Sequence, residues 1–179
     1  MRIISGQWRG RKLVAPKGEA TRPTADRVRE TLFSMLASRL GDFDGLAVGD
    51  FFAGSGALGL EALSRGAASC LFVEQEAAAC EALKTNATTF GLRPDLRRQS
   101  VLTLGLATAP LDLLLLDPPY HTGAGAVALE RLQRLGWIGP QSWISLETAA
   151  DETPDVRGLE VDAERRVGPA RLTLLRASS

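Results

Sequence analysis

The tetrapeptide Asp117-Pro118-Pro119-Tyr120 carries the side chains in this sequence that are best suited to chemistry. An ionised Asp117 and the backbone carbonyls only accept hydrogen bonds, and Tyr120 offers a flat face for stacking. The two prolines donate no backbone N–H and prevent a helix from starting, so the turn can hold outward-facing carbonyl oxygens. A planar base with an exocyclic amine fits this set, because its two N–H donors meet two acceptors. The alternative is an ordinary Asp-Pro turn after a strand.

A second stretch, residues 50–59, has the composition of a cofactor-binding loop. It reads Asp50-Phe51-Phe52-Ala53-Gly54-Ser55-Gly56-Ala57-Leu58-Gly59. Its glycines allow a tight turn and a close approach of the backbone to a ligand, and the following helix supplies free N–H groups. Glu74, twenty positions after Gly54, can accept hydrogen bonds from two ribose hydroxyls. Candidate cofactor contacts in this part of the chain are Asp50, Phe52, Ala53, Gly54, Gly56 and Glu74.

The charge of Asp50 distinguishes between the possible cofactors. The spacing of Gly54, Gly56 and Gly59 also matches the dinucleotide fingerprint, so NAD is one alternative and a plain strand–helix turn is another. Asp50 argues against NAD, because a carboxylate just before the loop would repel a pyrophosphate. The same carboxylate would attract the ammonium and sulfonium groups of S-adenosylmethionine, which is therefore the expected cofactor.

Both motifs need strands that end where the motifs begin. The apolar run Leu111–Leu116 is too short for a helix and long enough for a buried parallel strand. Such a strand would bring Asp117 to the edge where an α/β sheet binds its ligands. Strands and helices alternate along the chain, which predicts a doubly wound α/β fold whose last two strands pair as an antiparallel hairpin. The predicted strands are 47–51, 70–73, 96–98, 111–116, 143–147, 160–167 and 171–175, and the predicted helices are 24–40, 57–65, 75–90 and 126–135.

The amino-terminal part is strongly basic, although the whole chain has a formal net charge of zero. Residues 1–29 contain eight lysines and arginines and two acids, a charge of +6, and residues 30–179 carry −6. This segregation favours a polyanionic partner for the amino-terminal part. Three of the arginines surround the start of a helix, where the helix dipole disfavours cations and a charged ligand would be expected. The candidate RNA contacts are Arg2, Trp8, Arg9, Arg11, Lys12, Arg22, Arg27 and Arg29.

Residues 2–5 and 12–15 are predicted to form a short β-hairpin with an irregular tip at 6–11. Trp8 lies between basic residues at this tip, an arrangement that suits base stacking beside phosphate contacts. The alternative interpretation is that Trp8 covers the edge of the core.

Length and composition point to one globular domain. The chain has 179 residues, of which 45% are hydrophobic and 23% charged. No apolar run approaches the roughly 20 residues of a membrane span, and the first residues lack the apolar core of a signal peptide. The two cysteines, Cys70 and Cys80, indicate neither a disulfide framework nor a metal site. We therefore expect a cytoplasmic protein with no membrane partner and no metal.

Together the motifs resemble those of the bacterial 16S ribosomal RNA guanine-N2 methyltransferases of the RsmD type. The resemblance covers nearly the whole chain, and its most specific part is 22–33, because methyltransferases at large share only the glycine loop and the proline turn. It rests on residues 1–6 with 9–11, on 22–33, on 50–62 and on 117–120.

The resemblance implies a Rossmann-like, mostly parallel sheet of seven strands in the order 3-2-1-4-5-7-6, with the last strand antiparallel. It implies a basic hairpin extension, 1–21, followed by a methyltransferase domain, 22–179. The substrate would be ribosomal RNA in an assembled or assembling small subunit, and we expect a monomer. By this resemblance the glycine loop and Glu74 hold S-adenosylmethionine, and the target guanine is held by Asp117, Pro118, Pro119 and Tyr120.

The chain departs from the family pattern in one place. Many such enzymes carry an aspartate after the third strand, near the adenine amine, and this sequence has Gln99 and Ser100 there. Both are kept as candidate cofactor contacts, because a side-chain or backbone carbonyl could accept the same hydrogen bond. His121, the only histidine, is interpreted as a loop residue rather than a general base.

Three other functions remain open on sequence alone. An adenine-N6 methyltransferase would share the proline turn, and an NAD-dependent oxidoreductase would share the glycine spacing. A non-catalytic RNA-binding protein would keep the basic segment and transfer no methyl group.

Overall fold

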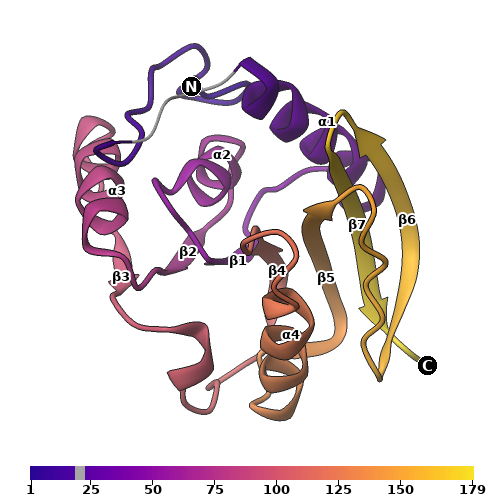
Figure 1. Cartoon of the computed structure of the whole chain (residues 1–179). Coiled ribbons are helices and arrows are strands. Elements are labelled where there is room, and N and C mark those ends of the chain that lie inside the picture. Colours follow the sequence, from indigo (N-terminus) through magenta and orange to yellow (C-terminus); the bar gives the residue numbers. More distant parts are fainter. Residues whose placement is uncertain (19–22) are drawn as a thin grey trace.

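A mixed seven-stranded sheet in the order β3-β2-β1-β4-β5-β7-β6 runs through the molecule (Figure 1). The computed structural model describes residues 1–18 and 23–179. The first five strands of this order are parallel neighbours, whereas β7 is antiparallel to both β5 and β6. The predicted order and the antiparallel last strand are therefore confirmed. The strands are β1 Ala47–Phe51, β2 Ser69–Val73, β3 Asp95–Arg97, β4 Leu111–Leu116, β5 Ile138–Ala149, β6 Leu159–Val167 and β7 Ala170–Ala177.

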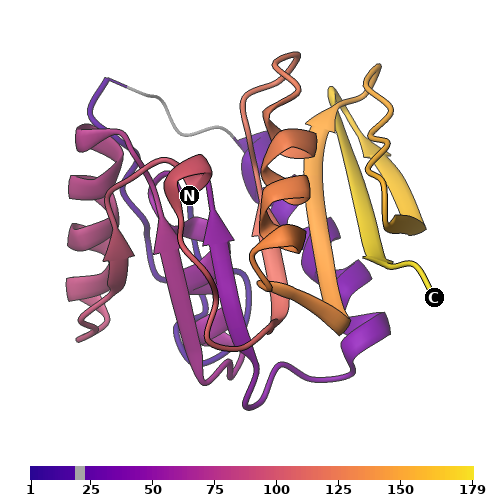
Figure 2. The ribbon, with the colours of Figure 1, turned by 90° about the horizontal axis from the view of Figure 1, so that it is seen from below.

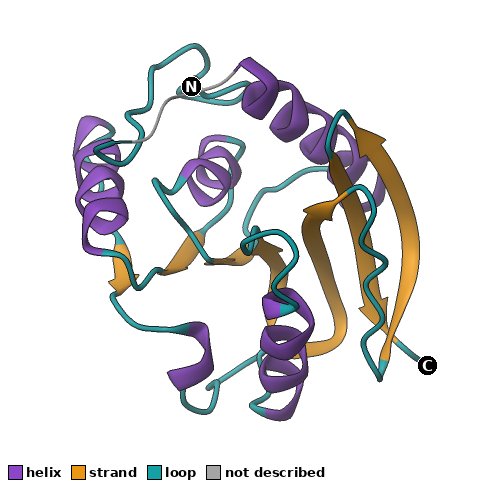
Figure 3. Cartoon of the chain, in the orientation of Figure 1, coloured by secondary structure: helices purple, strands orange, loops and turns teal. Residues whose placement is uncertain are grey.

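Helices cover both faces of this sheet (Figures 1 and 3). On one face lie α1 Pro23–Leu40, α2 Ala57–Ser64 and α3 Ala77–Thr89. On the other face lie the short 3₁₀ helix η1 Val101–Thr103 and α4 Ala124–Arg134, and α4 crosses in front of β4 and β5 in Figure 2. None of the helices that the structure describes is long and apolar enough to cross a membrane.

The strand β4 shows why two helical layers are needed. Its side chains alternate between the two faces, with Leu113 and Leu115 in the core beneath α1 and α2 and Leu114 and Leu116 in the core beneath α4. All four leucines are buried. A parallel strand that is apolar on both faces must be covered on both, which is the doubly wound arrangement predicted from the sequence.

The ends of the elements follow local signals. Pro23 is the first residue of α1, a position where its missing N–H costs nothing, and Gly41 follows the last turn with a φ of 78°. β1 and β4 have the predicted bounds. β5 begins at Ile138, five residues before the prediction, with a register shift against β4 that admits Gly139 and Pro140. The turn η1 was not predicted, and the Ser100 hydroxyl caps it by accepting a hydrogen bond from the Leu102 N–H.

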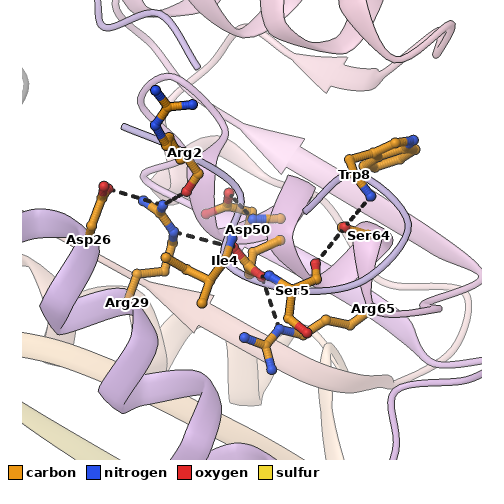
Figure 4. A network of polar contacts seen from close by, with 11 residues as sticks. Arg2, Ile4, Ser5, Trp8, Asp26, Arg29, Asp50, Ser64 and Arg65 are labelled. Atoms are coloured by element: carbon orange, nitrogen blue, oxygen red, sulfur yellow. Dashed lines mark hydrogen bonds and ion pairs between the residues drawn. The ribbon is translucent and has the colours of Figure 1, made fainter. Parts of the chain in front are cut away.

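The predicted amino-terminal hairpin is present in a reduced form. One antiparallel bridge joins Arg2 and Lys12, and the N–H groups of Ile3, Gly10 and Leu13 donate to the carbonyls of Arg11, Ile3 and Met1. The N–H groups of Ile4 and Ser5 donate instead to the carboxylate of Glu61 on α2, at 2.8 and 3.0 Å (Figure 4). These bonds tie the segment to α2, and two hydrogen bonds between Val14 and Asn86 tie it to α3. The buried side chains of this segment, Ile3 and Leu13, belong to the core beneath α1 and α2.

Candidate functional site

The carboxyl ends of the central strands open into a cavity of about 720 Å³. Its wall is made by the segments that follow β1, β2, β3 and β4 and by the last part of β5. This is the edge at which open α/β sheets bind ligands, and the volume lies within the range of small-molecule sites. Nine of the predicted site residues line the cavity, namely Phe52, Gly54, Glu74, Gln99, Ser100, Asp117, Pro118, Pro119 and Tyr120.

Glu74 organises the glycine loop from the end of β2. Its Oε1 accepts a hydrogen bond from the Gly54 N–H and its Oε2 accepts one from the Glu76 N–H, both at 2.8 Å. A carboxylate has about four lone-pair sites, so two remain for hydroxyl donors. The loop then enters α2 through Gly56, whose φ is 84° and where an added Cβ would lie 2.9 Å from the side chain of Leu83. Gly56 thus shapes the loop from behind and does not line the cavity.

Asp50 does not occupy the place that its sequence position suggested. It is completely buried beneath the loop, and its Oδ2 accepts a hydrogen bond of 2.9 Å from the Gly59 N–H (Figure 4). Its Oδ1 has no hydrogen-bond partner among the described residues. Burial raises the pKa of Asp50, and the nearby carboxylates of Asp117 and Glu74 raise it further.

The prediction that Asp50 contacts the cofactor is therefore corrected: Asp50 ties the loop to α2 and does not line the cavity. Ala53 is likewise buried, its N–H bonded to the Val73 carbonyl, and does not line the cavity. The electrostatic argument against a pyrophosphate passes to Glu74 and Asp117, which do face the cavity.

Gln99 and Ser100 have different capacities for a ligand. The Nε2 of Gln99 donates to the Thr103 hydroxyl at 3.0 Å, and its Oε1 accepts no hydrogen bond from the described residues. The Ser100 hydroxyl is engaged by the Leu102 N–H at 3.1 Å. Gln99 therefore offers a side-chain carbonyl at the place where the family pattern has an aspartate.

The turn 117–120 faces an acid that was not among the predicted site residues. The register pairs Leu116 of β4 with Leu146 of β5, so the next residues, Asp117 and Glu147, lie side by side at the cavity wall. The Tyr120 hydroxyl donates to Glu147 Oε2 at 2.7 Å. An acid at the end of the predicted strand 143–147 was the available signal for Glu147, because carboxyl ends of parallel strands meet at one edge.

The carboxyls of Asp117 and Glu147 interact across the cavity wall, and their negative charges repel each other when both are ionised. Desolvation by the surrounding protein raises the pKa of Asp117, and the negative charge of Glu147 raises it further. Desolvation also raises the pKa of Glu147. Asp117 still contacts the water of the cavity, which screens part of this repulsion. Among the described residues no lysine or arginine forms an ion pair with either acid, so the site presents hydrogen-bond acceptors without a cation.

The loop after the turn is fastened through Glu152. One oxygen of Glu152 accepts from the His121 N–H at 3.0 Å and the other accepts from the Ala149 N–H at 2.7 Å. His121 has a φ of 59°, and its exposed ring lies 3.6 Å from Asp151 rather than in the cavity lining. The position of His121 agrees with its interpretation as a loop residue.

The predicted RNA contacts separate into three groups. The exposed cations are Arg2, Arg9, Arg11, Lys12 and Arg27, and Arg22 lies outside the described residues. Trp8 is half-buried and stacks on Phe90 with ring centroids 4.5 Å apart and an interplanar angle of 11°. Trp8 thus lies at the core edge, the second of its two interpretations.

Arg29 has a structural place that the sequence did not reveal. Its side chain is only 3% exposed, lies 3.5 Å from Glu61 and 3.2 Å from Asp26, and donates to the Arg2 carbonyl (Figure 4). Arg29 cannot reach an RNA phosphate from this position, so its prediction as an RNA contact is corrected. The charge that opposes it at the start of α1 is the buried carboxylate of Glu61.

The comparisons with known proteins agree with this geometry. The model of the family described as Conserved hypothetical protein 95 matches residues 1–176. The chain belongs to this family. The resemblance found in the sequence motifs is thereby confirmed.

Relatives and solved structures extend the match. The Ribosomal RNA small subunit methyltransferase D of Escherichia coli (strain K12) is 40% identical over 153 residues, covering 84% of this chain and 76% of the relative. The protein of the same name from Haemophilus influenzae is 38% identical over 160 residues, covering 85% and 80%. The structure of yhhF from Escherichia coli superposes with a TM-score of 0.86 at 35% identity over 99% of this chain and 98% of that one.

A more distant structure shows the generality of the fold. Magnesium protoporphyrin IX methyltransferase from Synechocystis, solved with bound SAM, has a TM-score of 0.63 at 15% identity, covering 90% of this chain and 87% of that one. At this identity the likeness concerns the fold alone.

Proposed function

We propose that this protein transfers a methyl group from S-adenosylmethionine to the exocyclic N2 amine of a guanine in small-subunit (16S) ribosomal RNA. The observation that carries the proposal is the cavity wall itself. It places the acceptors and the aromatic ring of the turn 117–120 in the same cavity as the hydroxyl-binding Glu74 and the free carbonyl of Gln99. The names of the two relatives above support ribosomal RNA as the substrate class.

The described side chains fit S-adenosylmethionine. Glu74 keeps acceptor capacity for the two ribose hydroxyls while it holds the glycine loop, and the Oε1 of Gln99 suits the adenine amine. The lining contains acids and no lysine or arginine among the described residues, which favours a cationic ligand over a pyrophosphate. When bound, S-adenosylmethionine supplies an electrophilic methyl group on its sulfonium.

The remaining chemistry belongs to the turn. Asp117 and the Pro118 carbonyl accept the two N–H bonds of the guanine amine and favour a pyramidal nitrogen, whose lone pair is then available. Tyr120 stacks on the base, which must leave its helix to enter the pocket. The methyl group would pass from the sulfonium to N2 as its S–C bond breaks, the neutral thioether would leave, and Asp117 would take the amine proton and release it to water. These residues act by positioning and electrostatics.

The partner and the setting belong to the same proposal. The exposed cations of residues 1–21, with Arg27, would contact phosphates of ribosomal RNA in an assembled or assembling small subunit, and residues 22–179 would perform the transfer. We propose a cytoplasmic enzyme that works as a monomer.

Methyl transfer to RNA from cells that lack the protein tests the proposal. The purified protein is given radiolabelled S-adenosylmethionine with naked ribosomal RNA or with small subunits, and the labelled nucleoside is identified. We expect N2-methylguanosine. Label in N6-methyladenosine would replace guanine by adenine as the target, and RNA binding without any transfer would leave a non-catalytic RNA-binding protein.

A further inference from the structure

Glu147 is a cavity-lining acid to which the mechanism above gives no part. It stands beside Asp117 through the pairing of β4 with β5, and no other residue of β5 lines the cavity. Its Oε2 accepts the hydrogen bond of the Tyr120 hydroxyl at 2.7 Å. Its other oxygen accepts no hydrogen bond from a donor group that the structure describes.

We propose that Glu147 determines the specificity for guanine by accepting the N1–H of the base while Asp117 holds the neighbouring amine. This inference rests on the proposed function and adds a second contact to it. Two carboxylates side by side present acceptors only, and they match two adjacent donors on the edge of a planar base.

The edges of the bases explain the selectivity. Guanine carries donors at both N1 and N2, which are adjacent ring and exocyclic positions. Adenine and cytosine each place an acceptor nitrogen beside the amine, and that nitrogen would face the carboxylate of Glu147 across the shared edge. A site built to bind a donor rejects analogues that lack it, because its buried acceptor is left unpaired. The proline turn alone contacts only the amine, so it would not distinguish guanine from adenine or cytosine.

Tyr120 gives this arrangement a fixed geometry. Its hydroxyl holds Oε2 of Glu147, so the free oxygen points along a defined direction while the same ring is available for stacking. Tyr120 is 37% exposed, which leaves part of the ring surface open to the cavity. The ring of Tyr120 would thus position the base by stacking, while Glu147, which is bonded to Tyr120, accepts the N1–H of the same base.

The proximity of the two acids predicts a pH signature. Guanine brings donors to both acids and therefore favours their ionised forms, so binding should strengthen as pH rises through the raised pKa of the pair. The other ionisable groups around the pair are Asp50 on β1, Glu74 after β2, Tyr120 in the turn and Glu152 after β5. All of them are acids, and among the described residues none has an ion pair with a cation.

The test uses Glu147→Gln and three versions of the target RNA. Gln keeps the size of the side chain and can still accept from Tyr120, but it turns an amide donor toward the base. The RNA found in the methyl-transfer experiment is prepared with guanosine, inosine or 2-aminopurine riboside at the methylated position. Inosine keeps the N1–H and lacks the amine, whereas 2-aminopurine keeps the amine and has an acceptor at N1. Dissociation constants are measured without cofactor, and rates of methyl transfer are measured with guanosine and 2-aminopurine.

We expect the wild-type protein to bind the guanosine RNA roughly 10- to 100-fold more tightly than the 2-aminopurine RNA, the usual scale for a charged acceptor left without its donor. The inosine RNA, which lacks the amine that Asp117 holds, should also bind more weakly than the guanosine RNA. In Glu147→Gln the ratio of guanosine to 2-aminopurine affinity should fall to about one or reverse, and the pH rise of guanosine binding should move to lower pH because Asp117 loses its anionic neighbour. Glu130→Gln, the same change at an exposed site on α4 outside the cavity lining, should keep the wild-type ratio.

The outcomes separate the two proposals. If the wild-type protein methylates guanine N2 and Glu147→Gln keeps the full preference over 2-aminopurine, Glu147 does not read N1 and only this inference fails. If the wild-type protein methylates another base or none, the proposed function fails first. A Glu147→Gln protein with an unchanged melting temperature and a collapsed ratio establishes the role of Glu147, because a merely structural effect would weaken all three RNAs alike.

Discussion

Two acidic clusters of this protein differ in what surrounds their carboxylates. The first is Glu61 with the guanidinium groups around it, and the second is the pair of Asp117 and Glu147. Glu61 on α2 is completely buried, its oxygens accept from the N–H groups of Ile4 and Ser5, and two guanidinium groups lie within 3.5 Å (Figure 4). Asp117 and Glu147 face each other at the cavity wall, without an ion pair to any lysine or arginine that the structure describes. The negative charge of Glu61 is neutralised by arginines of the same chain. The acceptor oxygens of Asp117 and Glu147 remain available to the donors of a ligand.

The difference teaches how to assign a role to an acid in this fold. A buried carboxylate with cations and N–H donors around it holds segments together, as Glu61 joins the amino-terminal segment to α1 and α2. Two carboxylates held together against their repulsion are unfavourable in the free protein, and such pairs are typical of functional sites. Asp50 stands between these cases, with one oxygen used by Gly59 and the other unsatisfied among the described residues.

The largest expected effect comes from changing the unneutralised cluster. Asp117→Asn should lower the rate of methyl transfer by about 10²- to 10⁴-fold, because an amide cannot take the amine proton and turns a donor toward the amine. The affinity for S-adenosylmethionine should stay close to that of the wild type, since Asp117 matters most as the amine becomes pyramidal. Single-turnover rates and calorimetry measure the two quantities. A parallel loss of cofactor affinity and rate would make Asp117 structural.

A change in the neutralised cluster, at Glu61, should lower the stability of the fold. Glu61→Ala should lower the free energy of unfolding by about 3–5 kcal/mol, because it removes the buried carboxylate beside Arg29 and leaves two N–H groups without their acceptor. Urea denaturation measures this change. Glu130→Ala, which removes an exposed glutamate on α4, serves as the matched control and should stay within about 0.5 kcal/mol of the wild type. A loss below about 1 kcal/mol for Glu61→Ala would contradict the comparison.

Much of the site was accessible from the sequence because its signals are local. The apolar run before Asp117 and the glycines after Phe51 located two strand ends, and both strands have the predicted bounds. Whether a side chain near the end of a strand lines the cavity is harder to predict. Asp50 lies inside β1 and accepts from the Gly59 N–H of α2, whereas the first cavity-lining residue of this segment is Phe52, two positions later and beyond the end of the strand.

The features that were missed depend on contacts between distant parts of the chain. Glu147 ends a predicted strand, but its place beside Asp117 comes from the register of β4 with β5. The amino-terminal segment is held against α2 by Glu61, more than fifty residues away, whose carboxylate accepts from the N–H groups of Ile4 and Ser5. The same carboxylate withdraws Arg29 from the basic surface. In each case the deciding contact joins residues that are far apart in the chain.

Glu74 tests an acid with a divided role. Glu74→Ala should weaken S-adenosylmethionine binding by about 1–3 kcal/mol, since it removes acceptors for the ribose hydroxyls and loosens the loop at Gly54. Calorimetry with S-adenosylmethionine and with NAD gives the result, and NAD should not bind to the wild-type protein. Glu81→Ala, an exposed change on α3, should leave the affinity unchanged. Equal binding of NAD and S-adenosylmethionine would refute the cofactor assignment.

The exposed cations of the amino-terminal segment should make RNA affinity depend on salt concentration. Replacing Arg9 and Arg11 together by alanine should flatten the slope of log RNA affinity against log salt by roughly 1–1.5 units, since each phosphate that is no longer neutralised removes about 0.7. Arg11 also donates to the Thr89 carbonyl at 3.1 Å, so the melting temperature is recorded alongside. Cofactor affinity should barely change, because neither side chain lines the cavity. An unchanged slope would place the polyanion elsewhere.

The smallest expected effect is the cost of the unneutralised pair in the free protein. The pKa of Asp117 is higher in the folded chain than in the unfolded one, so its contribution to stability is full below the unfolded value near pH 4 and is lost as pH rises through the folded value. Asp117→Asn removes that loss. Its melting temperature should therefore gain on the wild type as pH rises from about 4 toward neutrality. The gain should be modest, because cavity water screens Asp117. Parallel pH curves for the two proteins would show that the pair costs nothing, and the contrast with Glu61 would then concern geometry and not charge.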